Sequence, residues 1–114
     1  MAQVSFSENA LLHIRAVLAT QPIVFPVVSI SWSKGIVDNS RNSAGTVTWQ
    51  TVQPASWYAA IVDWGDFPDP AKRDRLLEQM HGLRVFRDDR ARSEQGTLHV
   101  TLTENGLAVE HTTA

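Results

Sequence analysis

The pattern of apolar and polar positions near the N-terminus predicts a short strand followed by an amphipathic helix. Val4 and Phe6 fall on one face of the weakly alternating segment MAQVSF. Ser7 is a favourable N-cap for residues 8–20, ENALLHIRAVLAT, whose apolar positions form a single stripe. Because Pro22 cannot continue a helix, we expect the helix to end just before it.

A period of two follows and predicts two strands joined by a long polar loop. Val28, Ile30 and Trp32 alternate with serines, which is typical of a strand with one buried face. The segment TVTWQTV, residues 46–52, resumes this period. The residues between them, 34–45 (KGIVDNSRNSAG), are expected to form a loop longer than a plain hairpin connection of about two to five residues.

The next two segments predict a buried strand and a surface helix. Residues 56–64, SWYAAIVDW, are apolar on both faces, so we expect a central strand covered on both sides. The following helix is predicted over residues 70–81, with Asp69 as its N-cap, Pro70 at its first position and Gly82 just past its end. Its narrow apolar stripe places it on the surface.

The C-terminal third predicts a short strand over residues 83–87, a charged turn over 88–96 and a hairpin over 97–111. Asn105-Gly106 is the strongest short hairpin signal in the chain and predicts a two-residue turn. That turn pairs Leu102 with Val109, and Val100 with His111.

These elements together predict a single α+β domain over residues 1–114. We expect a mostly antiparallel sheet of about six or seven short strands with two helices. A chain of 114 residues with 43% hydrophobic and 19% charged residues has the size and composition of one globular domain.

Composition excludes several functional classes. The chain has no cysteine, so it has no disulfide, thiolate nucleophile, zinc ribbon or cysteine-bound iron–sulfur cluster. Its formal net charge of −2 gives no electrostatic case for binding nucleic acid. No apolar stretch approaches the roughly 20 residues of a membrane span, and no signal-peptide pattern is present. We therefore expect a cytoplasmic protein without a membrane partner.

Two sets of side chains are candidates for metal binding or catalysis. The segment DWGDFPD supplies Asp63, Asp66 and Asp69, whose oxygens suit a hard cation, but it lacks the spacing of a calcium-binding loop. The histidines have no partner ligand at helical spacing; they are His13, His81, His99 and His111. We predict no catalytic residue, metal or cofactor, although a small metal-dependent enzyme using Asp63, Asp66 and a histidine stays open as the alternative.

The tryptophans and the polar loop are the candidates for binding. Trp32 and Trp64 fall on apolar faces and are expected in the core. Trp and Arg are the residue types that most often anchor interfaces, and the predicted binding residues are Trp49, Trp57, Arg41, Lys34 and Asp38. A small polar ligand held by the loop 34–45 is a further possibility.

Both ends of the chain resemble the A-type iron–sulfur carriers, also called HesB-like domains. The segment VSFSENALLHIRAVLA is similar to that family's opening strand and capped helix, and LRVFRDD with GTLHVTLTENGLAVEH is similar to its later strand and closing hairpin. The resemblance implies the family's fold and a tendency to pair. The family carries its cluster on cysteines that this chain lacks at SKGIVDNSRNSAG and at EHTTA, so no cluster ligand is implied here.

The absence of catalytic motifs, together with the tryptophans and the long loop, favours a non-catalytic domain that binds a protein partner. A homodimer is one such assembly, and a cysteine-free relative of the HesB-like carriers is one such protein.

Overall fold

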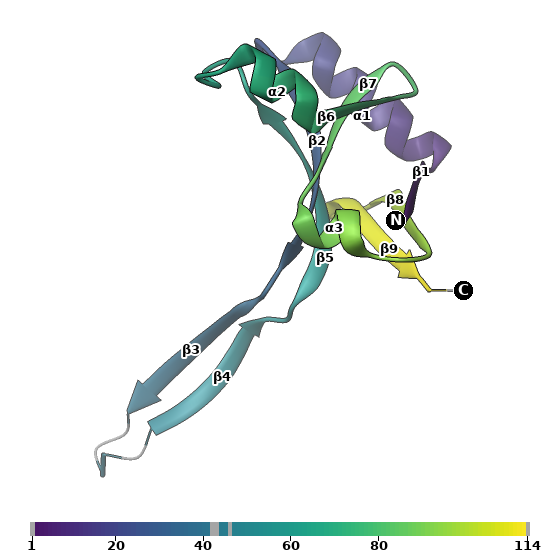
Figure 1. The fold of residues 1–114 in the computed structure, drawn as a ribbon. Coiled ribbons are helices and arrows are strands. Elements are labelled where there is room, and N and C mark those ends of the chain that lie inside the picture. Colours follow the sequence, from purple (N-terminus) through teal and green to yellow (C-terminus); the bar gives the residue numbers. More distant parts are fainter. Residues whose placement is uncertain (1, 42–43, 46, 114) are drawn as a thin grey trace.

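The structure is a computed structural model that describes residues 2–41, 44–45 and 47–113, with only the backbone described over 36–41 and 47–53. Figure 1 shows the order of the elements along this part of the chain. They are β1 (Gln3–Phe6), α1 (Glu8–Thr20), β2 (Pro26–Ser33), β3 (Ile36–Arg41), β4 (Val47–Gln53), β5 (Ser56–Asp63), α2 (Pro70–Leu76), β6 (Leu77–Met80), β7 (Leu83–Arg87), α3 (Asp89–Ser93), β8 (Thr97–Thr103) and β9 (Gly106–Thr112).

The described strands form two mixed sheets and one separate ribbon. The sheets have the orders β1-β8-β9 and β5-β2-β7-β6, and the ribbon is β3-β4. The β1–β8 and β2–β7 pairs are parallel and the others antiparallel. The α+β class and the predominance of antiparallel pairing are thus confirmed. The described strands form two mixed sheets and a ribbon instead of one sheet, and a short third helix accompanies the two predicted ones.

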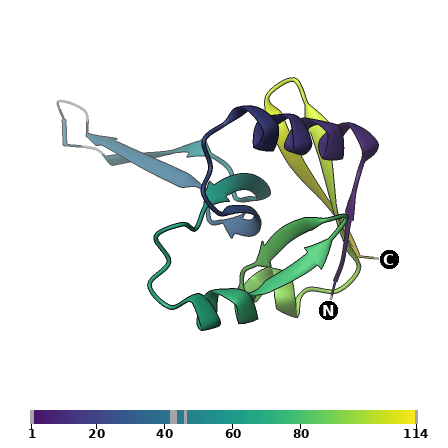
Figure 2. The same cartoon turned by 90° about the horizontal axis from the view of Figure 1, so that it is seen from above.

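The core lies between α1 and the inner faces of both sheets. Ile14 of α1, Ile30 of β2, Val85 of β7 and Leu98 of β8 are completely buried there. Figure 2 shows α1 along one side of the body and the β6–β7 hairpin along the other. Burying these side chains is the main stabilising term of the fold.

The outer face of the four-stranded sheet carries a second, aromatic cluster. Trp64 stacks on Phe67 with ring centroids 5.1 Å apart, and it contacts Phe86 of β7 at the same centroid distance. The guanidinium of Arg92 lies 5.5 Å from the Phe86 ring. Trp64 was expected in the core, but it is half-buried and packs on the opposite face of the sheet from the main core.

The two sheets are tied together at both ends. At one end, strand β5 packs beside β9. At the other end, the side chain of Arg87 in β7, which is only 3% exposed, bonds to β6 of its own sheet and to the residue before β1 of the other sheet. Its guanidinium donates to both oxygens of Glu78 at 2.6 Å and to the carbonyl of Ala2 at 2.6 Å. The charge of Arg87 is thus paired within the protein, which a buried guanidinium requires.

The first helix is confirmed together with its cap. Helix α1 runs from Glu8 to Thr20, and the Ser7 hydroxyl accepts a hydrogen bond from the Ala10 N–H at 3.1 Å. This bond satisfies one of the unpaired donors at the helix start.

The second helix is shorter than predicted. Asp69 caps it and Pro70 begins it as expected, but α2 ends at Leu76. The next residues pair with β7 as the strand β6, and the turn between them has His81 at φ 53° and Gly82 at φ 76°. Two consecutive positive φ values are typical of a tight hairpin turn rather than a helix end. Pairing with β7 thus outweighs the helical spacing of the local sequence.

The C-terminal hairpin forms, but in a different register. Val100 pairs with Val109, and Thr103 with Gly106, so the turn is Glu104-Asn105 rather than Asn105-Gly106. Asn105 lacks the positive φ of the predicted turn; among described non-glycine residues only His81 has one. A shift of two residues keeps each side chain on its predicted face.

Three further predictions of local structure are wrong. The expected loop 34–45 contains the strand β3, because it pairs with β4. Strand β5 is an edge strand of its sheet instead of a central one, although β9 packs beside it. The expected charged turn 88–96 contains α3, whose N-cap Asp88 accepts from the Ala91 N–H at 2.8 Å.

Candidate binding arm and its aromatic base

The β3–β4 ribbon projects from the body as an arm (Figure 1), and it is the most distinctive feature of the molecule. Strands β2 and β5 lead into it from the body, and β3 and β4 pair with each other, with an irregularity between Ile36 and Val37. The radius of gyration is 17.2 Å, whereas a compact domain of this length has about 13 Å. The arm accounts for the difference.

Three of the five predicted binding residues lie on the arm. In the register of the ribbon, Asn39 is opposite Trp49 and Arg41 is opposite Val47. Positions two apart along a strand share a face, so Arg41 and Trp49 occupy positions on one face of the arm and Asp38 occupies the other. The sequence analysis treated Asp38 and Arg41 as loop residues and could not derive this arrangement.

The other two predicted residues lie where the arm meets the body. Lys34 is exposed in the connection between β2 and β3. Trp57 is in β5, directly opposite Trp32 of β2. The structure therefore places the five residues along one route, from the arm to its base, rather than in one cluster.

An aromatic cluster forms the base of the arm, and we call Trp32, Trp57, His111 and Arg90 the aromatic base. The Trp57 ring meets Trp32 edge to face at a centroid distance of 5.2 Å and His111 at 5.8 Å. Arg90 of α3 lies 4.1 Å from the centroid of the Trp32 ring, in cation–π contact. Since Trp57 also packs on the core, a substitution there alters packing as well as surface.

Hydrogen bonds between side chains and the backbone hold the aromatic base in position. The Trp32 N–H donates to the Asp88 carboxylate at 2.9 Å, so the N-cap of α3 is fixed to β2. His111 donates from Nε2 to the Gln95 carbonyl at 2.8 Å, with a Glu94 oxygen 4.0 Å away. Arg90 and His111 were not singled out as binding residues, because their neighbours come from elements far apart in sequence.

The aspartates of the segment 63–69 have structural roles. Asp63 accepts hydrogen bonds from the backbone N–H groups of Phe25 at 3.0 Å, Gly65 at 2.8 Å and Val24 at 3.2 Å. These bonds, that of Phe25 foremost, hold the pKa of Asp63 below its ordinary value of 3.8. Asp69 is the N-cap of α2, and Asp66 is exposed.

The histidines are likewise not gathered into a site. His99 Nδ1 lies 2.5 Å from the Ser5 hydroxyl, and Glu110 is its register partner on β9. His81 meets the ring of Phe6 edge to face. Within the described residues, no three histidine or carboxylate side chains come together in a way that could hold a metal ion.

Comparisons of the chain with protein-family models, with curated proteins and with solved structures found no match. Across the described residues, none of the helices has the length and apolar character needed to cross a membrane. The interpretation of the site therefore depends on its geometry.

Proposed function

We propose that the chain is a non-catalytic protein-binding domain whose contact surface is the arm together with its aromatic base. The arm itself is the observation that carries this proposal. No third described strand pairs with β3 or β4, and a two-stranded ribbon is marginally stable without further packing. Open strand edges also accept strands from a partner.

The charge of the arm favours a protein partner over nucleic acid. Residues 34–41 carry two cations and one anion, Lys34, Arg41 and Asp38, and residues 47–53 carry no charge. Ribbons that bind nucleic acid need several phosphate contacts from Lys or Arg. Aromatic residues with one arginine suit a protein interface.

A second copy of the chain is the first partner to test, and a cytoplasmic homodimer is the assembly that we propose. The resemblance to HesB-like carriers supports the idea of pairing, and kinship with that family without its cluster remains a prediction.

Amide hydrogen exchange measured at increasing protein concentration tests the proposal. We expect the outward-facing amides of Ile36–Arg41 and Val47–Gln53 to exchange rapidly in dilute protein and to become protected as the chains associate, because pairing satisfies them. The amides of the β8–β9 hairpin serve as an internal reference and should not change. Protection that grows elsewhere while the arm stays unprotected would show that the contact surface is not the arm.

A further inference from the structure

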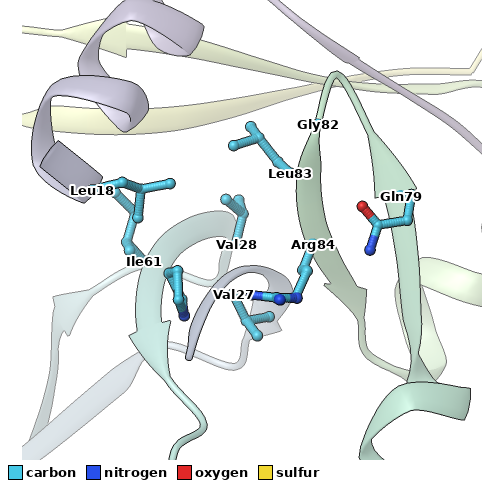
Figure 3. Close-up of a pocket in the computed structure, with 9 residues that line it drawn as sticks. Leu18, Val27, Val28, Ile61, Gln79, Gly82, Leu83 and Arg84 are labelled. Carbon is cyan, nitrogen blue, oxygen red and sulfur yellow. The ribbon is translucent and has the colours of Figure 1, made fainter. Parts of the chain in front are cut away.

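A cavity of about 190 Å³ lies on the body, away from the arm, between the C-terminal half of α1, strands β2 and β5, and the β6–β7 hairpin (Figure 3). Six apolar side chains, two polar side chains and one glycine line the cavity. These residues are Leu18, Pro26, Val27, Val28, Ile61, Leu83, Gln79, Arg84 and Gly82.

The lining has an apolar part and a polar part. Leu18 from α1, Ile61 from β5 and Leu83 from β7 supply aliphatic surface from three separate elements. Figure 3 shows Arg84 extending from β7 toward Val27, with the Gln79 amide on the neighbouring strand. Small-molecule sites combine apolar side chains with a few polar groups that fix the orientation of the ligand, and this lining supplies both kinds.

Arg84 is held in place by the ring of Phe25. Its guanidinium carbon lies 4.0 Å from the centroid of that ring, and the guanidinium carbon of Arg73 lies 3.8 Å from the same centroid. Two guanidinium groups that close to one ring must occupy its opposite faces. Stacking fixes the plane of Arg84 and leaves its N–H edge available for hydrogen bonds.

No described carboxylate forms an ion pair with Arg84. Arg73, by contrast, has an oxygen of Asp74 at 3.2 Å. The carboxylate of Asp63, which is bonded to the Phe25 segment, already accepts three backbone N–H groups. The guanidinium fork of Arg84 therefore has no carboxylate partner among the described residues, and carboxylates match its geometry.

We propose that this cavity binds a small monocarboxylate with an apolar body, whose carboxylate lies on Arg84 and whose body lies against Leu18, Ile61 and Leu83. A cavity of about 150 Å³ holds benzene, so this slightly larger one suits a benzoate-sized acid. The proposal is independent of the arm and of its partner.

Titration of the full ¹⁵N-labelled chain with benzoate, and separately with benzamide, tests this proposal by NMR. We expect benzoate at millimolar concentration to shift the amide signals of the lining residues, and benzamide to bind about tenfold more weakly or worse because it carries no charge. Equal binding of the two probes, or no shift with either, would overturn the proposal.

Two variants locate the carboxylate. Arg84→Gln should weaken benzoate binding about tenfold or more, whereas Arg75→Gln, which removes an exposed cation from α2, should leave it unchanged. Leu18→Trp fills the cavity and should abolish binding while Arg84 stays in place. Thermal unfolding confirms that each variant is folded, and unchanged benzoate affinity in folded Arg84→Gln or folded Leu18→Trp would show that the acid binds elsewhere.

Discussion

At the scale of single residues, Asp63 shows how an apparent metal ligand can be a structural anchor. Its carboxylate connects the end of β5 to the segment that leads into β2, through the N–H groups of Val24, Phe25 and Gly65. Sequence alone showed three nearby aspartates but not the backbone donors, because Val24 and Phe25 are far from Asp63 in the chain.

Asp63→Asn should lower the melting temperature near neutral pH, because the amide is a weaker acceptor for three N–H groups. Since folding lowers the pKa of Asp63 below 3.8, its ionised form contributes stability above that pH. The contribution is lost as the pH falls through the folded-state pKa. Thermal unfolding from neutral to acidic pH should therefore show the difference between wild type and variant shrinking in acid.

The matched control is Asp66→Asn in the same segment, because Asp66 is exposed and accepts no hydrogen bond from the described residues. It should unfold like the wild type at every pH. If the difference in melting temperature between Asp63→Asn and wild type stayed constant down to the lowest pH, ionisation of Asp63 would not be the source of the stability.

At the scale of elements, local signals predicted where several elements begin, whereas even the strong Asn105-Gly106 signal predicted its hairpin without the right register. The Ser7 cap, the Asp69-Pro70 start and the alternation in β2 predicted their elements correctly, because each signal acts within a few residues. The end of α2 was missed because Leu77 and Met80, three residues apart, fit helical spacing better than the period of two of a strand. Only pairing with β7 decides between them, and pairing is a long-range contact that spacing does not reveal.

Alanine substitutions at two glycines with positive φ test the turns that connect these elements. Gly82 has φ 76° and open space where a Cβ would stand. Gly82→Ala should therefore lower the free energy of unfolding by about 1 kcal/mol, through backbone strain alone. Gly96 has φ 84°, and a Cβ there would collide with the backbone carbonyl of Thr112. We expect Gly96→Ala to cost about 2 kcal/mol more than Gly82→Ala in chemical denaturation. Equal losses of unfolding free energy in the two variants would contradict the close approach of the Thr112 carbonyl to Gly96.

At the scale of the whole molecule, the α+β class and the main core face could be predicted, whereas the arrangement of the sheets could not. Alternation identifies which side chains are buried but not which strands pair in parallel, such as β1 with β8. The arm was missed for a related reason. Residues 38–41 are all polar and do not alternate with apolar positions, so they were interpreted as a loop, although pairing with β4 makes them a strand.

The candidate site was predicted in part. Lys34, Asp38, Arg41, Trp49 and Trp57 do lie along the arm and at its base, but their order in space follows from the ribbon register. The contacts of Trp57 with Trp32 and His111 join three strands, and the partners of that residue could not be derived from its position in the sequence.

The measurement that tests the central claim most directly is sedimentation velocity of the full chain and of a chain without the arm. Ser33 and Ser56 are register partners, so joining Gly35 to Pro54 closes the hairpin through Lys34-Gly35-Pro54-Ala55 and leaves the body unchanged. We predict that the shortened chain unfolds at nearly the same temperature and is monomeric at concentrations where the full chain associates. A shortened chain that associates as tightly as the full one, or a full chain that is monomeric throughout, would contradict the proposed homodimer through the arm.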